Sequence, residues 1–314
     1  MYSVFTATLS PMLVMFLCIV TGFVLNKKKL CPENTASVLS KLENTIIVPC
    51  LVLNTFINYC TVESLKKQYT LILYSLLAVT IAIILSYLLS PLFEKDKYRK
   101  NIYRYALAFG NFGFMGNAIV PKILGEEFLY EYLLFTLPLN LAVYTWGLIA
   151  LTPENKRSKS PLLNLINPIV IAMGLGIILG LVGAKEYLPK FILSTVDNIA
   201  ACMGPLAMIL TGFVIGDYTF TKLLSNKKVY IATALRLFIF PTLFVALVLL
   251  LGANKQTATL CLFAYATPLG LNTVVFPAAF DCDTSTGASM AMISHVLSII
   301  TIPIMYALFK IVLG

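Results

Sequence analysis

Two stretches of the sequence place polar residues, glycine and proline inside otherwise apolar surroundings. Residues 108–121 include three glycines, two asparagines and a proline, and residues 266–277 include a glycine, an asparagine, two threonines and two prolines. Glycine and proline both weaken a continuous helix, and a broken helix leaves backbone N–H and C=O groups without partners. In a membrane, such groups are tolerated only inside protein or beside a water-filled cavity, where they can bind a substrate or an ion.

We therefore expect these stretches to form a substrate-binding site. Pro121 supplies no N–H and disfavours the helical conformation of the residue before it, so it is expected to interrupt the first helix. The amino ends of the resulting half-helices would attract an anion, and the alternative is a pair of kinked, tightly packed helices. The candidate binding residues are Asn111, Gly113, Gly116, Asn117, Pro121, Thr267, Pro268, Gly270, Asn272, Thr273 and Pro277.

The prolines also indicate an internal repeat. Pro49 and Pro121 are 72 residues apart, as are Pro205 and Pro277, and the two pairs are offset by 156 residues. At the same offset, Asn272 corresponds to residue 116. Two halves with five spans each must cross the membrane in opposite senses, which is an arrangement common in transporters.

The composition indicates an all-α polytopic membrane protein. Hydrophobic residues make up 59% of the 314 residues and charged residues 12%, whereas soluble domains carry about 25% charged residues. A soluble globular protein is therefore excluded. A span needs about 20 apolar residues, and ten apolar segments are expected at residues 8–25, 36–59, 69–91, 103–121, 128–151, 164–183, 190–216, 228–251, 257–279 and 285–312. The two repeats would comprise residues 1–155 and 156–314.

Basic residues predict the orientation of these spans. The net charge of +9 is spread over short loops and not gathered in one patch, so no nucleic-acid partner is expected. Loops after odd-numbered spans contain thirteen Lys and Arg residues, including Lys156, Arg157 and Lys159, and the remaining loops with the tail contain seven. Because positively charged short loops stay cytoplasmic, both termini are expected to be extracytoplasmic.

Other residues are candidates for supporting the site. Asn44, Pro49, Asn54, Pro205 and Thr211 lie in the second and seventh spans, where they would either line the cavity or hydrogen-bond a neighbouring helix.

Two ionisable residues are candidates for coupling. His295 would either relay protons or remain a neutral hydrogen-bonding group. Arg236 would either counter an anionic substrate or extend toward the cytoplasmic side along its apolar stem. No Asp or Glu is expected in the middle of a span.

Enzyme motifs are not found in the sequence. Ser289 and His295 are six residues apart, so they would face different sides of one helix. The sequence contains no nucleotide-binding or metal-binding motif, and the seven cysteines lack metal-ligand spacing. We therefore expect neither an enzyme nor a bound cofactor or metal.

Seven short motifs together resemble a known family. They are Pro49, the segment Gly-Asn-Phe-Gly-Phe-Met-Gly at 110–116, Asn167-Pro168, Gly204-Pro205-Leu-Ala, Arg236-Leu-Phe-Ile-Phe-Pro241, Pro268 and Thr301-Ile-Pro303. The chain resembles the auxin efflux carrier family, the prokaryotic relatives of the plant PIN-FORMED auxin transporters. The resemblance implies ten spans in two inverted repeats, with a scaffold domain of spans 1, 2, 6 and 7 and a transport domain of spans 3–5 and 8–10.

The resemblance also implies transport of organic anions at the crossing of spans four and nine, which maps onto Asn111, Gly113, Pro268 and Asn272. The chain departs from the family pattern in two places. Ala118 stands where the family often has proline, and the third span has serine and threonine in its middle, where plant members carry an acidic residue.

These observations predict a secondary transporter of a small organic anion in a prokaryotic plasma membrane, working by elevator-like or rocking motion. Na⁺ or H⁺ would be the coupling ion for import, and a homodimer is compatible with the sequence. One alternative is a sodium-coupled symporter of the bile-acid carrier type. Another is a membrane sensor that binds a ligand without transporting it.

Overall fold

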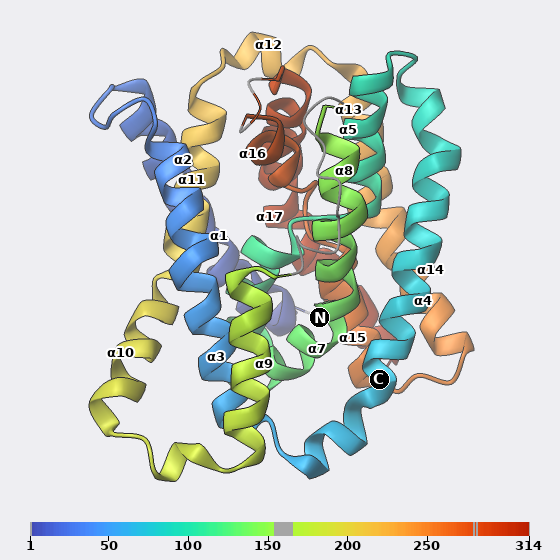
Figure 1. The fold of residues 1–314 in the computed structure, drawn as a ribbon. Coiled ribbons are helices and arrows are strands. Elements are labelled where there is room, and N and C mark those ends of the chain that lie inside the picture. Colours follow the sequence, from blue (N-terminus) through green and yellow to red (C-terminus); the bar gives the residue numbers. More distant parts are fainter. Residues whose placement is uncertain (1, 154–165, 279, 281, 314) are drawn as a thin grey trace.

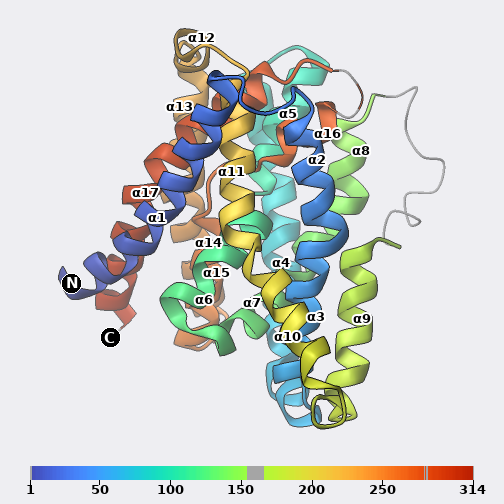
Figure 2. The ribbon, with the colours of Figure 1, turned by 90° about the vertical axis from the view of Figure 1, so that its left-hand side faces the viewer.

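The computed structural model describes residues 2–153, 166–278, 280 and 282–313, and the regular structure in these residues is helical (Figure 1). The predicted all-α class is therefore confirmed for the described residues. The basic residues Lys156, Arg157 and Lys159, the boundary between the two predicted repeats, and the predicted span ends at 164 and 279 lie outside them. The two ends of the chain lie close together in both views (Figures 1 and 2).

The first half of the chain folds into a series of helices, several of which continue one another through π-helical segments. They are α1 (Tyr2–Lys27), α2 (Thr35–Leu42), η1 (Glu43–Ile47), α3 (Val48–Tyr59), α4 (Val62–Phe93), α5 (Lys97–Ala108), η2 (Phe112–Gly116), α6 (Asn117–Leu124), α7 (Glu126–Ala142), η3 (Val143–Gly147) and α8 (Leu148–Leu151).

The second half shows a similar order of long and interrupted helices. It comprises α9 (Pro168–Leu181), the 3₁₀ turn η6 (Ala184–Glu186), α10 (Lys190–Ala201), α11 (Met203–Gly216), α12 (Phe220–Leu224), α13 (Lys227–Ala234), η7 (Leu235–Ile239), α14 (Phe240–Leu250), α15 (Lys255–Tyr265), α16 (Asn272–Ala278) and α17 (Ser285–Leu313).

Polar side chains fix where several helices begin. Thr61 and Ser64 form a reciprocal capping box at the start of α4. Asp96 accepts from the N–H of Arg99 at the start of α5, and Asn254 accepts from the N–H of Thr257 at the start of α15. These caps satisfy N–H groups that a helix start leaves without partners.

Most helices overlap the ten predicted segments, but several extend beyond the predicted bounds, and the short helices η6 and α12 lie between segments. Among the described residues, seven helices are long and apolar enough to cross a membrane: Val4–Lys27, Thr35–Tyr59, Val62–Phe93, Glu126–Leu151, Lys190–Gly216, Lys227–Leu250 and Ser285–Val312. Two shorter apolar helices are Phe112–Leu124 and Pro168–Leu181. A polytopic membrane protein is thus supported, and the count of ten spans stays a prediction.

The helices pack in two groups. In the first, which we call the α1–α11 bundle (α1, α2, α3, α9, α10 and α11), α1 lies along α11 and α3 contacts both α9 and α10. In the second, which we call the α4–α14 bundle (α4–α8 and α13–α17), α4 contacts α5 and α7, and α14 contacts α15. Figure 1 shows α3, α10 and α11 on the left and α4 and α14 on the right. The two bundles meet where α17 packs against α1.

Two expectations about local structure are wrong. Pro121 lies inside α6 and does not interrupt this helix, and Pro277 likewise lies inside α16. The interruptions lie at residues 109–111 and 266–271 instead. In addition, an acidic residue does occupy the interior of a span, because Glu43 lies nine residues into the helix Thr35–Tyr59 and is fully buried.

Candidate functional site

The two interrupted helices cross and pair at their breaks. Gly110 and Leu269 form an isolated antiparallel bridge. The N–H of Asn111 donates to the carbonyl oxygen of Pro268 at 2.7 Å, and Phe109 has an extended conformation. Backbone groups released by one break are therefore partly satisfied by the other, as a membrane interior demands. The first break lies between α5 and η2, and the second lies between α15 and α16.

Arg236 joins the ends of the two helices that precede the breaks. Its side chain is 0% exposed. The guanidinium donates to the carbonyl oxygens of Leu107 and Ala108 at 3.4 and 3.5 Å and to those of Ala264 and Thr267 at 3.2 and 3.4 Å. Helix carboxyl ends carry partial negative charge, so the two helix ends stabilise the cation. The expectation that Arg236 extends along its stem to a surface is therefore wrong.

The side chain of Asn111 is fixed by His295 from α17. His295 Nδ1 lies 2.7 Å from the carbonyl oxygen of Ala291, and Nε2 lies 2.8 Å from Asn111 Nδ2. Because a carbonyl can only accept, Nδ1 carries the hydrogen, and Nε2 of a neutral ring then accepts from the Asn111 amide. Asn111 is 3% exposed and His295 is 1% exposed. The amide of Asn111 is thereby held in one orientation beside the break.

Tyrosines hold the amides on the other side of the crossing. Asn272 Nδ2 donates to the hydroxyl of Tyr105 at 2.9 Å. The hydroxyl of Tyr144 donates to Asn44 Oδ1 at 3.4 Å, which links η3 to η1. The amides of Asn272 and Asn44, one from each bundle, therefore lie beside the crossing.

A cavity of about 40 Å³ lies at the crossing, between the two bundles. A cavity needs about 10–15 Å³ to hold one water molecule, so this cavity has room for only a few. Within the part of the chain that the structure describes, no acidic or basic side chain lines the cavity. The α1–α11 bundle contributes Asn44, Val48, Val52, Ile169 and Met173, and the α4–α14 bundle contributes Gly110, Asn111, Phe112, Gly113, Phe114, Asn117, Leu133, Asn140, Val143, Tyr144, Gly270, Leu271 and Asn272.

Two glycines near the first break have different surroundings. A Cβ at Gly116 would lie 2.0 Å from the hydroxyl oxygen of Tyr132, so only glycine fits there. A Cβ at Gly113 would meet no atom within 4 Å. Gly113 therefore faces the cavity, whereas Gly116 allows Tyr132 to approach and donate to the carbonyl of Phe112 at 3.2 Å.

Asn117 lies between this cavity and a larger one. Asn117 is 5% exposed, and its Oδ1 has no hydrogen-bond partner among the described residues. The larger cavity, which we call the α6-side vestibule, has a volume of about 240 Å³, and its polar lining consists of Asn54, Thr55, Asn117, Lys122, Glu126 and Asp197. An unpaired buried amide oxygen is costly, so Asn117 is a candidate for contact with a ligand or water.

A second vestibule of about 240 Å³ lies toward the other end of the molecule. This α16-side vestibule is lined by Ser37, Ser40, Lys41, Leu210, Asp217, Tyr218, Val274, Ala278 and Thr284, among others. Figure 2 shows α16 and α2 near one end of the protein and α6 and α10 near the other. Several positions in the two vestibules are related by the 156-residue offset, namely Asn54 with Leu210, Ala118 with Val274, Lys122 with Ala278, and Lys41 with Asp197.

Two groups at the α16 end have shifted pKa values. Burial raises the pKa of the Tyr218 hydroxyl, which also pairs with the Thr284 hydroxyl. Partial burial alone would raise the pKa of Asp283, but hydrogen bonds from Ser285 and the nearby charge of Arg99 outweigh it and lower this pKa below its usual value. Asp283 is therefore a carboxylate that caps α17.

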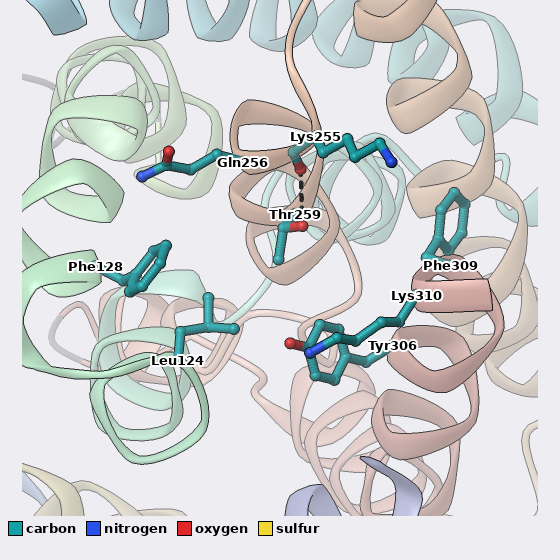
Figure 3. Close-up of a pocket in the computed structure, with 8 residues that line it drawn as sticks. All are labelled: Leu124, Phe128, Lys255, Gln256, Thr259, Tyr306, Phe309 and Lys310. Carbon is teal, nitrogen blue, oxygen red and sulfur yellow. Dashed lines mark hydrogen bonds between the residues drawn. The ribbon is translucent and has the colours of Figure 1, made fainter. Parts of the chain in front are cut away.

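A separate groove of about 260 Å³ lies away from the crossing, between α6, α7, α15 and α17 (Figure 3). It is lined by Leu124, Phe128, Lys255, Gln256, Thr259, Tyr306, Phe309 and Lys310. It contains none of the predicted binding residues. Among the described residues, no group of three or more His, Cys, Asp or Glu side chains is arranged to hold a metal ion.

The structure brings some of the predicted binding residues together and separates others. Asn44, Asn111, Gly113, Asn117, Gly270 and Asn272 line the central cavity. Asn54, Pro121 and Pro205 line the α6-side vestibule. The remaining predicted residues, which lie outside the lining of these cavities, are Pro49, Thr211, Gly116, Thr267, Pro268, Thr273 and Pro277. Of these, Thr211, Thr267 and Thr273 bond carbonyl groups of their own segments.

Sequence reasoning missed several residues of the site. Asn140 and Tyr144 line the central cavity, Tyr105 holds Asn272, and Ser294 accepts from the N–H of Leu269 at 3.0 Å. Asn140 and Tyr144 are four residues apart, so they share one face of a helix. That spacing in an apolar span was a signal available in the sequence.

Comparison with known proteins agrees with this geometry. A family model described as membrane transport protein matches residues 7–306, which is nearly the whole chain. No curated protein matches the chain.

Proposed function

The chain belongs to the membrane transport protein family, also known as the auxin efflux carrier family, and on that basis we propose that it is a secondary transporter of small organic anions. Members of this family are transporters and not enzymes. The proposed substrate carries a carboxylate and binds at the crossing of the two interrupted helices.

The observation that carries this proposal is the chemistry of the central cavity. The helix Phe112–Leu124 begins there, and the first N–H groups of a helix have no intrahelical acceptor. Together with the helix dipole, such N–H groups favour an anion. Asn117 adds an amide from the same helix, and Asn272 adds one from the second break. Because the lining contains no carboxylate, a bound anion would meet no like charge.

The placement of the cavities supports alternating access. The central cavity lies between the α1–α11 bundle and the α4–α14 bundle. We assign these bundles, as part of the proposal, the roles of scaffold domain and transport domain. Movement of one bundle against the other would enlarge it toward one vestibule at a time. The vestibules share positions related by the 156-residue offset, as expected for an inverted repeat. We propose an elevator-like or rocking motion on this basis.

The direction of net transport would follow from charge. An inside-negative potential contributes about 2.3 kcal/mol per charge per 100 mV, so uncoupled movement of a monoanion would favour export. Import would require coupling to Na⁺ or H⁺.

The test is flux of labelled malate and indole-3-acetate in proteoliposomes under an imposed potential. We expect saturable flux in the wild type and its loss in Asn111→Ala and Asn272→Ala. A matched control is Asn198→Ala, which changes an exposed asparagine on α10 and should leave flux unchanged. Strict dependence on Na⁺ would favour a sodium-coupled symporter of the bile-acid carrier type. Binding without flux in any gradient would favour a sensor.

A further inference from the structure

A fully buried acidic residue lies in the α1–α11 bundle, in the π-helical segment η1. Glu43 is 0% exposed, and neither of its carboxyl oxygens has a hydrogen-bond partner among the described residues. Ionisable residues inside membrane spans normally pair with one another or with backbone carbonyls, and they mark ion or proton pathways. Glu43 is unusual because it is both buried and unpaired.

Glu43 lies along the chain between residues that line two of the cavities described above, although it lines neither itself. Ser40, three residues before it, lines the α16-side vestibule. Asn44 and Val48, one and five residues after it, line the central cavity. Glu43 is thus within about one helical turn of each cavity. The π-helical turn is itself a local distortion, and such turns occur frequently at functional sites.

Among the described residues, the helices that pack most extensively against η1 supply no counter-ion. The segment contacts α2, α3, α9, α10 and α11. Helices α9 and α11 carry no charged side chain. Lys41 on α2 and Lys190 on α10 are exposed, and Asp197 on α10 accepts from Asn54. The other titratable groups on these elements are Cys50 and Tyr59 on α3 and Cys202 at the start of α11, and across the cavity Tyr144 bonds Asn44.

A proton is the ligand that fits this environment. A buried carboxylate without a partner carries a large desolvation cost, whereas the neutral acid does not carry a charge into the interior. A metal ion would need several oxygen ligands around it, and no other polar group bonds the Glu43 carboxyl among the described residues.

We propose that Glu43 is a proton-binding site that links the arrangement of the two bundles to pH. In the arrangement described here, the Glu43 carboxyl holds one proton. When the bundles move and the α16-side vestibule extends past Ser40, the O–H bond breaks and the proton passes to vestibule water, which leaves a hydrated carboxylate. The return movement requires the reverse step, in which the carboxylate takes one proton from water.

The first experiment needs no transport substrate. We would measure the apparent melting temperature of the purified full-length protein between pH 5 and pH 9. If the native state holds a proton on Glu43 that the unfolded chain releases, stability must fall as pH rises. Glu43→Gln imitates the neutral acid, so its profile should lose this slope and lie above that of the wild type at high pH. Glu43→Asp keeps a titratable group and should keep the slope.

The matched control is Glu63→Gln, which removes an exposed carboxylate at the start of α4 and should leave the wild-type slope intact. An unchanged slope in Glu43→Gln would overturn the proposal. So would a wild-type melting temperature that does not fall with rising pH.

The second experiment rests on the proposed transport function. In proteoliposomes with a pH gradient, coupling of one proton to one anion allows up to about tenfold accumulation of labelled malate per pH unit. One pH unit is a tenfold ratio of proton concentration, and its free energy can drive an equal ratio of malate concentration. We expect Glu43→Gln to lose this accumulation and to keep exchange of labelled for unlabelled malate. If the melting experiment succeeds while no variant transports malate, the proton site stands and the proposed function fails. If accumulation persists in Glu43→Gln, the proton site is not the coupling site.

Discussion

The two helix breaks are held by different means. At the first break, residues 109–111, the side chain of Asn111 is oriented by His295, and the carbonyl of Phe112 accepts from Tyr132. At the second break, residues 266–271, the hydroxyls of Thr267 and Thr273 bond carbonyls of the same segment.

The difference shows how the backbone at the crossing can be held in place by hydrogen bonds while the cavity beside it can still accept a ligand. The longer second break satisfies part of its own backbone, whereas the first depends on side chains from α7 and α17. Two elements connect the breaks. Arg236 bonds the helix ends that precede both of them, and α17 presents Ser294 to the second break and His295 to the first. Mutations should therefore distinguish side chains that stabilise both breaks from side chains that stabilise only one.

The largest effect is expected from Arg236→Met, because it removes the donor shared by both breaks. Several buried carbonyl oxygens would lose a hydrogen bond, and each unsatisfied buried group costs about 1–3 kcal/mol. We expect a loss of at least about 3 kcal/mol, measured as unfolding in detergent. Arg236→Lys should recover only part of it, since an ammonium cannot span both helix ends. If the Arg236→Met protein is as stable as the wild type, Arg236 does not stabilise both breaks.

Substitutions in α17 should distinguish the two breaks. His295→Phe leaves the buried Asn111 amide without its acceptor and should cost about 1–3 kcal/mol. Ser294→Ala removes a hydroxyl that accepts from Leu269, and it should cost about 0.5–1.5 kcal/mol. Thermal unfolding in detergent measures both, and malate flux should fall more in the histidine variant. Equal losses of flux would mean that the two breaks are supported alike.

Two glycines near the first break form a matched pair. Gly116→Ala would place a methyl group against the Tyr132 hydroxyl, and such overpacking costs about 1–3 kcal/mol. Gly113→Ala points into open space, so its stability should change by less than about 0.5 kcal/mol. The second variant should nevertheless weaken anion binding, because the methyl group enters the cavity. Stability and malate binding measured on the same preparations test both statements.

A small effect is expected at the amino end of α17, which positions the supports of both breaks. Asp283 caps this helix, and its lowered pKa means that its contribution is fully present above the usual Asp value of about 3.9 and is lost as pH falls from there through the lower pKa of the native state. The side chain is 49% exposed, so Asp283→Asn should cost less than about 1 kcal/mol. The variant should show a smaller loss of stability than the wild type when the pH is lowered from 6 to 3.

Much of the helical framework could be predicted from the sequence because apolar runs and charged loops are local signals. The positions of the breaks could not, because they depend on tertiary partners. Pro121 removes one backbone hydrogen bond, yet α6 continues past it to Leu124. Gly110 and Leu269 could not be paired from spacing, because the 156-residue offset matches residue 110 with residue 266 and not with 269.

The site was only partly predictable from the sequence, because some of its residues give a local signal and others do not. Asn111, Asn117 and Asn272 stand out as amides in apolar spans, and they line the cavity. Tyr105 and Tyr144 did not stand out, because tyrosine is common in this chain. Glu43 lies close to Lys41 near the start of an apolar run, which gives no sign of burial, whereas helix packing buries it completely.

The single tryptophan offers the most direct test of an anion site at the crossing. Trp146 packs against Phe109 in the first break, with ring centroids 5.6 Å apart, and is the only tryptophan in the chain. We would titrate the purified protein with acetate, malate and benzoate and record its intrinsic fluorescence. The account predicts a saturable change for at least one carboxylate in the wild type and its loss in Gly113→Leu, which fills the cavity. An equal saturable change in Gly113→Leu, or none in the wild type, would contradict binding at the crossing.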